Sequence, residues 1–495
     1  MKFEKLFKNV RVVRPGGNGV DDIDIGIVDG KIARLEADLP ADSSAQVIDG
    51  QGRLVFPGLV DAHMHVGIYS PLEEDAVTES KAAAMGGVTS ALTYFRTGQY
   101  YLNKGGSYED LYPEVLAKSA GNYWVDYAYH LAPIASSHID EMESLLVNHG
   151  VSSFKIFMFY GGYGLHGKTD GNAQKEFLMI GDDESYDIAH FEFIMRSAQK
   201  LMQKYPDVAD QISVSLHCEL ADILNAYTKM VRAEGKLTGL RAYSAARPPH
   251  SEGLAIWIAS YLAYETECVN INLLHLSSKK AVEAAMMMKS IFPHINFRRE
   301  VTIGHLMMDY DTPAGCHAKV NPPIRSREDV EFLWEKLLEG ELDWVVSDHA
   351  CCSEELKTEN QDHTDGDNIW ISKSGFGGTE YLLSALYSEG SIRGMSVNHM
   401  AQVVCKNPAD RYGLLNKGDI EIGFDADLVL LDPDEKFVVR AEESESSQGY
   451  TPFEGMQLTG RVKSTYLRGN LVYDSGNIIG GATGKYLSRP TIGPS

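Results

Sequence analysis

The chain contains 495 residues, 44% of them hydrophobic, and carries a formal net charge of −24. This length is sufficient for one large domain and a smaller one. The negative charge argues against nucleic acid or an anionic membrane as the main partner. The sequence has no apolar run long enough to predict a membrane helix, and its charged first residues do not resemble a signal peptide.

The six cysteines are scattered through the chain, which is not the dense pattern of a disulfide-stabilised secreted domain. The adjacent pair Cys351 and Cys352 also lacks the spacing of a CxxC metal motif. We therefore expect a cytoplasmic protein in a reducing compartment.

Both ends of the chain read as short strands joined by Gly and Asp turns. The expected strands are 10–13, 24–28, 31–35 and 46–49 at the start, and 427–431, 437–439, 462–467 and 470–473 at the end. Neither end has enough strands to bury a sheet face alone. We therefore predict that residues 1–56 and 418–495 form one small domain of the β-sandwich type.

Between these ends, strand-like and helix-like segments alternate. The eight expected strands are 58–65, 88–95, 125–131, 152–159, 212–217, 269–276, 295–299 (with a possible extension to 306) and 342–347. Eight such units predict a (β/α)₈ barrel over residues 57–417. A doubly wound open sheet is the alternative, but no GxGxxG motif follows the first strand.

Ligand-type side chains recur where these strands end. His63 and His65 share one face of the first strand, and further candidates follow on later strands: Lys155, His217, His275 and Asp348. Strand ends of a parallel barrel open on one rim, so these residues should converge. Single histidines are more often hydrogen-bonded side chains, and an Asp can simply cap a helix. A buried lysine is rare, and it tends to be neutral. The joint pattern therefore favours a two-metal site.

An ordered series of motifs covers nearly the whole chain. These motifs are PGLVDAHMH (57–65), SSFKIFMFY (152–160), SLHCE (215–219), ARPPHSEG (246–253), LLHLSS (273–278), NPPIR (321–325), SDHA (347–350) and GFGGTE (375–380). In this series the chain resembles the cyclic amidohydrolases of the amidohydrolase superfamily. It looks most similar to hydantoinases and dihydropyrimidinases, with allantoinases and dihydroorotases as more distant relatives.

The resemblance implies two divalent metal ions, with zinc favoured over manganese, iron or cobalt. One ion would be bound by His63, His65 and Asp348, and the other by His217 and His275. Lys155 would react with CO₂ to become N6-carboxylysine and bridge the two ions. An unmodified ammonium has no lone pair and cannot be a ligand, so the modification also explains why a lysine belongs here.

The resemblance also implies an activity, the opening of a small cyclic amide by a metal-bridging hydroxide. Asp348 would act as general base and then as general acid, and Tyr160 would stabilise the oxyanion and contact the substrate. Asn321 and Ser374 would also contact the substrate. Relatives of this kind imply a homo-oligomer, either a tetramer or a dimer.

Three departures leave the substrate open. Ser374 stands where hydantoinases often carry Asn, and Gly67 stands where dihydroorotases carry an arginine, while TPFEG (451–455) looks more like the allantoinase branch. The alternatives are therefore an allantoinase-like or other cyclic ureide or imide hydrolase, and a non-catalytic dihydropyrimidinase-like scaffold. A one-metal deaminase on the same barrel is disfavoured by Lys155. The glycine-rich loop 161–167 is either a mobile lid or a plain surface loop.

Overall fold

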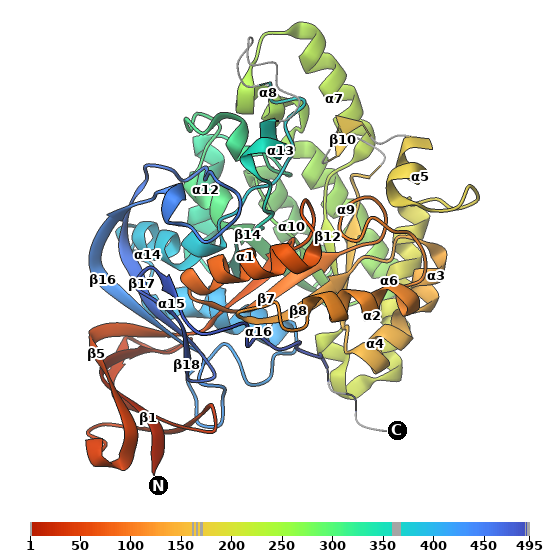
Figure 1. Ribbon diagram of the computed structural model, residues 1–495. Helices are drawn as coiled ribbons and strands as arrows, with labels where there is room; N and C mark the ends of the chain where they lie inside the picture. Colours follow the sequence, from red (N-terminus) through yellow and green to blue (C-terminus); the bar gives the residue numbers. More distant parts are fainter. Residues whose placement is uncertain are drawn as a thin grey trace.

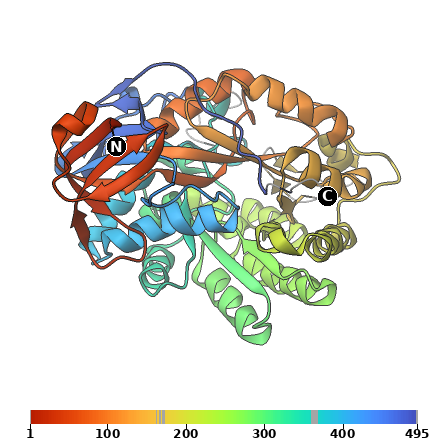
Figure 2. The same cartoon turned by 90° about the horizontal axis from the view of Figure 1, so that it is seen from below.

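The computed structural model describes residues 2–160, 163–164, 167–168, 172–358, 368–490 and 492. It confirms the predicted fold class, an eight-stranded parallel barrel with a separate β domain built from both ends of the chain (Figure 1). Two orthogonal views show that strands from the N-terminal and C-terminal ends of the chain lie side by side, next to the barrel (Figures 1 and 2). The domain boundaries at residues 56 and 418 remain a prediction.

The barrel strands are almost completely buried, as expected for parallel strands covered on both faces. They are β6 (Leu59–Met64), β7 (Val88–Phe95), β8 (Asp126–Leu131), β9 (Ser153–Phe157), β12 (Ser213–His217), β13 (Asn270–Leu273), β14 (Asn296–Thr302) and β15 (Trp344–Val346). The barrel closes where Met64 forms a bridge with His349 and the His65 amide donates to the His349 carbonyl at 2.7 Å.

Helices form the outer layer of the barrel and connect its strands (Figure 1). They are α1 (Leu72–Met85), α2 (Tyr108–Ser119), α3 (Ser136–Asp140), α4 (Met142–His149), α5 (Asn172–Leu178), α6 (Ile188–Lys204), α7 (Ala221–Glu234), α8 (Gly239–Ala246), α9 (Pro249–Thr266), α10 (Lys279–Ile291), α11 (Ile303–Met307), α12 (Arg327–Leu338), α13 (Glu354–Thr358), α14 (Leu382–Ile392), α15 (Val397–Ala401) and α16 (Asn407–Arg411). None of the described helices is both long and apolar enough to cross a membrane.

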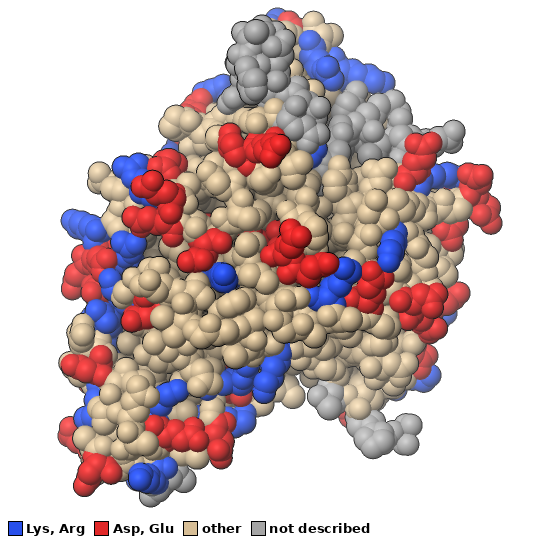
Figure 3. Space-filling view, viewed as in Figure 1, with Lys and Arg blue, Asp and Glu red and all other residues tan. Residues whose placement is uncertain are grey.

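The β domain is one mixed sheet in which parallel β1–β5 pairing and antiparallel β5–β16 pairing join the two chain ends. Its strands are β1 (Phe3–Val13), β2 (Val20–Asp22), β3 (Asp24–Val28), β4 (Lys31–Glu36), β5 (Ser44–Pro57), β16 (Leu428–Val438), β17 (Gln457–Leu467), β18 (Asn470–Asp474) and β19 (Asn477–Ile478). On the face shown in Figure 3, acidic and basic side chains are interspersed.

The loop 161–167, for which a lid was one interpretation, lies mostly outside the described residues. Only the backbone of its two short strands, β10 (Tyr163–Gly164) and β11 (Gly167–Lys168), is described, and these strands pair antiparallel. Whether this loop is a lid stays a prediction.

Candidate functional site

The structure brings the six predicted metal-site residues together at the carboxyl ends of the barrel strands. Five of them line one cavity: His65, Lys155, His217, His275 and Asp348. His63 is fully buried directly behind this wall. The ring centroids of His63 and His275 are 5.3 Å apart, and those of His217 and His275 are 4.3 Å apart. The side chains therefore converge as the strand order predicted.

His63, His65 and Asp348 form the tightest group. Each offers one ligand atom, and these atoms lie within 4.8 Å of one another. The Oδ1 atom of Asp348 is 3.1 Å from His63 Nε2 and 3.4 Å from His65 Nε2. Two imidazole nitrogens and one carboxylate oxygen are a donor set that zinc and related divalent ions accept.

Three of the histidines have their second ring nitrogen held by a neighbour. Glu300 Oε1 lies 2.7 Å from His63 Nδ1, the Tyr101 hydroxyl lies 2.8 Å from His65 Nδ1, and Glu219 Oε2 lies 2.7 Å from His217 Nε2. In metal sites, such contacts orient the ring and set its tautomer. They leave His63 Nε2, His65 Nε2 and His217 Nδ1 as the remaining ring nitrogens.

Three buried polar atoms at this point have no hydrogen-bond partner among the described residues. They are Lys155 Nζ, His275 Nδ1 and His63 Nε2, the last of which lies 3.1 Å from Asp348 Oδ1 without the geometry of a hydrogen bond. Buried polar atoms are rarely left unpaired, because their desolvation is then uncompensated. Their clustering beside Asp348 fits a group that binds lone pairs from several sides, and a divalent cation has this property.

The protonation states agree with this interpretation. Burial lowers the pKa of His63 and His275 well below the usual range, lowers the pKa of His65, and lowers that of His217 to about 4. These histidines are therefore neutral at pH 7, the form that ligates a metal. Burial also lowers the pKa of Lys155 to about 7, so a substantial fraction of its amine is unprotonated and nucleophilic near neutral pH.

Two of these residues have a strained backbone. His275 and Asp348 have φ angles of 35° and 54°, in the left-handed region that non-glycine residues seldom adopt. Such conformations cost about 1–3 kcal/mol each and persist where the surroundings impose them, most often at functional sites. The fold thus holds two side chains of the cavity in place at the expense of backbone energy.

The predicted substrate contacts Asn321 and Ser374 line the same cavity. The Tyr243 hydroxyl donates to Asn321 Oδ1 at 2.5 Å and lies 3.3 Å from Ser374 Oγ, so it ties the two residues together. Asn321 Nδ2 is buried and has no described partner. A buried amide N–H needs an acceptor, and a substrate carbonyl in this cavity would supply one.

Tyr160 is placed differently from the other predicted site residues. It is not part of the cavity wall but stacks behind Phe157, which is, with ring centroids 4.9 Å apart. Its hydroxyl accepts a hydrogen bond from Arg96 Nε at 2.8 Å. Arg96 is itself buried and has no carboxylate partner among the described residues. Its Nη1 atom donates to the carbonyls of Thr97 and Gln99, at 2.9 Å each. The phenol proton is therefore not used by this contact.

Several residues that support the site were not assigned a role from the sequence. Glu300 is an acidic residue within the buried strand β14, and this unusual position could have marked it as a functional candidate from the sequence. No feature of the sequence marks Tyr101 in this way. Charged side chains from three of the sequence motifs form ion pairs with one another. Arg247 pairs with Glu219, and Arg325 Nη2 lies 2.6 Å from Glu252 Oε2. The motifs SLHCE, ARPPHSEG and NPPIR thus form buried ion pairs behind His217.

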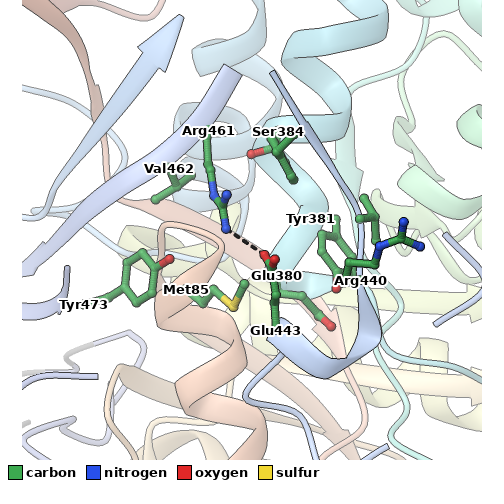
Figure 4. Close-up of a pocket in the computed structure, with 11 residues that line it drawn as sticks. Met85, Glu380, Tyr381, Ser384, Arg440, Glu443, Arg461, Val462 and Tyr473 are labelled. Atoms are coloured by element: carbon green, nitrogen blue, oxygen red, sulfur yellow. Dashed lines mark hydrogen bonds and ion pairs between the residues drawn. The ribbon is translucent and has the colours of Figure 1, made fainter. Parts of the chain in front are cut away.

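Another cavity lies between α14 and the β domain (Figure 4). Arg461 Nη2 and Glu443 Oε2 form an ion pair of 2.8 Å in its wall, and buried Glu380 faces the same space. It contains none of the predicted site residues and only about 20 Å³ of free space. Because none of the predicted site residues lines it, we do not regard this cavity as the substrate site.

Comparison with known proteins supports the same type of site. The model of the Amidohydrolase family matches residues 195–472. Allantoinase from Salmonella choleraesuis (strain SC-B67) is 31% identical over 480 residues, covering 96% of each chain. Allantoinase from Rubrobacter xylanophilus is 31% identical over 494 residues, covering 99% of this chain and 98% of its relative.

Among solved structures, dihydropyrimidinase from Brevibacillus agri NCHU1002 superimposes with a TM-score of 0.82 at 26% identity, covering 99% of this chain and 100% of the other. The sequence relatives are named allantoinases and this structural neighbour is named a dihydropyrimidinase, so the comparisons do not agree on one substrate. With the site geometry and these similarities taken together, the chain belongs to the amidohydrolase family and to its hydrolases of cyclic amides.

Proposed function

We propose that this chain is a metal-dependent hydrolase that opens a cyclic amide of the hydantoin or dihydropyrimidine type. The observation that carries the proposal is one cavity lined by neutral histidines, a carboxylate and a buried lysine whose amine has no hydrogen-bond partner among the described residues. Asn321 lines the same cavity, and its amide N–H likewise has no acceptor in the described part of the chain. Such a cavity matches a small polar ring with adjacent C=O and N–H groups.

His63, His65 and Asp348 would hold one divalent ion, and His217 and His275 a second, with zinc favoured. The Lys155 amine would attack CO₂, form an N–C bond and release one proton, which leaves an anionic carbamate to bridge the two ions. Metal ions in such a site lower the pKa of water and polarise a carbonyl. This assignment is supported by the position of the six side chains, five of which line one cavity while His63 is buried beside them.

The chain's own groups carry the proton transfers in this proposal. Asp348 takes a proton from the attacking water and delivers it to the ring nitrogen as the C–N bond breaks, because an amide nitrogen leaves poorly unless it is protonated. Asn321 and Ser374 bind the polar edge of the ring. Tyr160, whose hydroxyl accepts from Arg96, would donate its free proton to the oxyanion after a small movement toward the cavity.

A second candidate substrate is allantoin, which is a hydantoin ring with a ureido substituent. The two allantoinases, at 31% identity over nearly the whole chain, favour it specifically. A hydrolysis screen of metal-loaded protein with hydantoin, dihydrouracil, allantoin, dihydroorotate and simple cyclic imides tests both candidates. Ring opening of at least one cyclic ureide supports the proposal, and opening of none of these rings contradicts it.

The scaffold alternative differs in its metal content. A catalytic protein should purify with stoichiometric zinc, manganese, iron or cobalt, whereas a non-catalytic relative should not. Retention of all six metal-site positions in one cluster favours the enzyme. We further propose that the enzyme works as a homo-oligomer, a dimer or a tetramer.

Replacement of Glu300 with glutamine should weaken metal retention about 10- to 100-fold, as expected for a residue that orients a metal ligand. Burial raises the pKa of Glu300 to about 8, and a bound cation would favour its charged form. An amide at this position can donate to His63 Nδ1 and thereby disturb its tautomer. Metal loss on dialysis against a chelator measures the effect.

The matched control for this variant is Glu380→Gln. Glu380 is also a buried carboxylate, but it bonds Ser444 and contacts no predicted metal ligand. Equal metal retention in Glu300→Gln and Glu380→Gln would show that Glu300 does not act on His63.

Replacement of Tyr160 with phenylalanine should lower kcat about 100-fold without loss of metal, because one oxyanion donor is removed. Tyr186→Phe is the control, since Tyr186 belongs to the same aromatic cluster and its hydroxyl accepts a hydrogen bond from the Phe157 amide at 2.9 Å. A steady-state kcat in Tyr160→Phe as high as in Tyr186→Phe would remove Tyr160 from the mechanism.

A further inference from the structure

Arg96 is a buried cation at the rim of the barrel that carries the predicted site. It directly follows β7, so its backbone stands at the carboxyl end of a barrel strand, as the predicted metal ligands do. Its exposed fraction is 1%, although arginine is almost never fully buried unless it is paired with an acid. Burial of a charge without a counter-charge is costly, so this side chain requires an explanation beyond packing.

Aromatic rings take the place of an acid around Arg96. Its guanidinium carbon lies 4.4 Å from the ring centroid of Phe177, 5.4 Å from that of Tyr160 and 5.8 Å from that of Tyr101. The face of an aromatic ring attracts a cation but carries no net charge. The buried Nη2 atom of Arg96 has no hydrogen-bond partner in the described part of the chain. The positive charge is therefore stabilised without being cancelled.

The remaining donors of Arg96 have two different partners. Nη1 donates to the carbonyls of Thr97 and Gln99, which anchors the start of the loop after β7. Nε donates to the Tyr160 hydroxyl at 2.8 Å. The first contact is structural, whereas the second reaches the residue that we propose as the oxyanion donor. An experiment on Arg96 must therefore separate these two contacts.

The bond from Nε fixes the direction of the Tyr160 proton. A guanidinium has five N–H donors and no acceptor, so the phenol can only accept from it. The phenol proton must then point away from Arg96. Burial raises the pKa of Tyr160, whereas the charge of Arg96 and its hydrogen bond act to lower this pKa. Arg96 thus leaves the phenol free to donate elsewhere and makes it a stronger donor.

The neighbouring phenols lack a partner of this kind. The Tyr186 hydroxyl accepts from the neutral backbone amide of Phe157 at 2.9 Å, and the Tyr101 hydroxyl lies 2.8 Å from His65 Nδ1. Hydrogen bonds from charged donors are roughly twice as strong as those from neutral donors. Among these three phenols, Tyr160 is the one that the described structure bonds to a guanidinium.

We infer that Arg96 is a positioning residue for the reaction. It orients the Tyr160 hydroxyl as a donor and strengthens it toward the negative charge that develops on the carbonyl oxygen of the substrate. Arg96 is not among the described residues that line the cavity, so it acts through the phenol and not on the substrate. Donors held in advance are effective because they need not reorient as the charge develops. The inference rests on the proposed function, since it requires Tyr160 to act on the substrate.

A double-mutant cycle with Tyr160→Phe tests this inference. Arg96→Met removes the charge but keeps an unbranched side chain, and it should lower kcat about 10- to 100-fold with little change in KM. In the Tyr160→Phe background, the same substitution should cost less than about threefold, because the donor that Arg96 serves is already absent. An equal loss in both backgrounds overturns the inference and leaves Arg96 with its loop contact alone. An Arg96→Met protein with full kcat overturns it as well.

Arg489→Met is the matched control. Arg489 is also 1% exposed, and its Nη2 atom donates to the Tyr129 carbonyl at 2.8 Å and to Ser153 Oγ at 3.3 Å. Ser153 begins β9, so this arginine lies at the opposite end of the barrel from the predicted ligands. Its loss should lower the melting temperature but change kcat only a few-fold, by the same factor in both backgrounds. Arg96→Lys keeps a charged donor, should lose less kcat than Arg96→Met, and enters the cycle if Arg96→Met does not fold.

A measurement that needs no activity separates failure of this inference from failure of the proposed function. With a fluorinated tyrosine at position 160, fluorine NMR follows the ionisation of that one phenol. Arg96→Met should raise the midpoint by about one pH unit or more, because a nearby cation is lost, and Arg489→Met should not. Superimposable titration curves for Arg96→Met and the unaltered protein overturn the inference. A raised midpoint in a protein that opens none of the screened rings overturns the proposed function instead, and with it the catalytic part of the inference.

Discussion

Replacement of Lys155 with alanine is expected to lower activity by at least about 10³-fold and to remove bound metal, and acetate or propionate should restore part of both. Lys155 is 1% exposed and has no hydrogen-bond partner among the described residues, so the fold leaves its amine available for a purpose other than stability. Without an anionic bridge, two cations at close range repel each other. A short carboxylate can occupy the vacated space and supply the missing oxygen atoms.

Metal analysis and kinetics together measure this effect. Lys357 provides the matched control because it is also 1% exposed, but its Nζ donates to the Gly375 carbonyl at 2.7 Å. The Lys357→Ala variant should keep its metal even if the backbone around Ser374 and Gly375 is disturbed. A Lys155→Ala protein with full metal content and full activity would exclude the carbamate.

Replacement of Asp348 with asparagine should reduce kcat by about 10²- to 10⁴-fold, the usual contribution of a general acid–base. The amide keeps the size of the side chain near His63 Nε2 and His65 Nε2 but cannot accept and return a proton. The proposed second step is protonation of the leaving nitrogen. The Asp348→Asn substitution should therefore reduce kcat less for substrates whose leaving N–H is more acidic. Rates over a series of cyclic imides and ureides measure this dependence.

Asp75→Asn is the control for that variant. Asp75 is buried on α1 and accepts from the Gly67 amide at 2.6 Å, and burial raises its pKa well above the usual range, so an amide resembles its neutral form. Its activity should change only a few-fold. If Asp348→Asn loses the same factor with every leaving group, Asp348 does not act as the general acid.

The barrel was predictable because its strands are short buried runs separated by helical patterns. The expected strand 88–95 coincides with β7. The suggested extension of the seventh strand beyond residue 299 is correct as far as Thr302, where β14 ends, and wrong for residues 303–306, which belong to α11. An apolar run alone does not distinguish a buried strand from a buried helix, and the decisive feature is local: the Thr302 hydroxyl accepts from the His305 amide and caps α11.

The cluster of histidines, Lys155 and Asp348 was predictable from strand position, since every member lies in or just after a strand. Its supporting residues were not, because their contacts join distant parts of the chain. Glu300 and His63 are 237 residues apart, and Tyr101 reaches His65 from a loop. The position of Tyr160 behind Phe157 depends on packing around Arg96, which no sequence period reveals.

The closure of the barrel has a further consequence. The first and last barrel strands are joined through the Met64–His349 bridge and through hydrogen bonds from Ser347 to Asp61. The candidate ligands stand on both sides of this seam, His63 and His65 on one and Asp348 on the other. A chain that has not yet joined its two barrel ends possesses no complete set of donors. The donor set of His63, His65 and Asp348 is therefore complete only when the barrel is closed, and a substitution that opens this seam should disperse the three side chains even though it touches none of them.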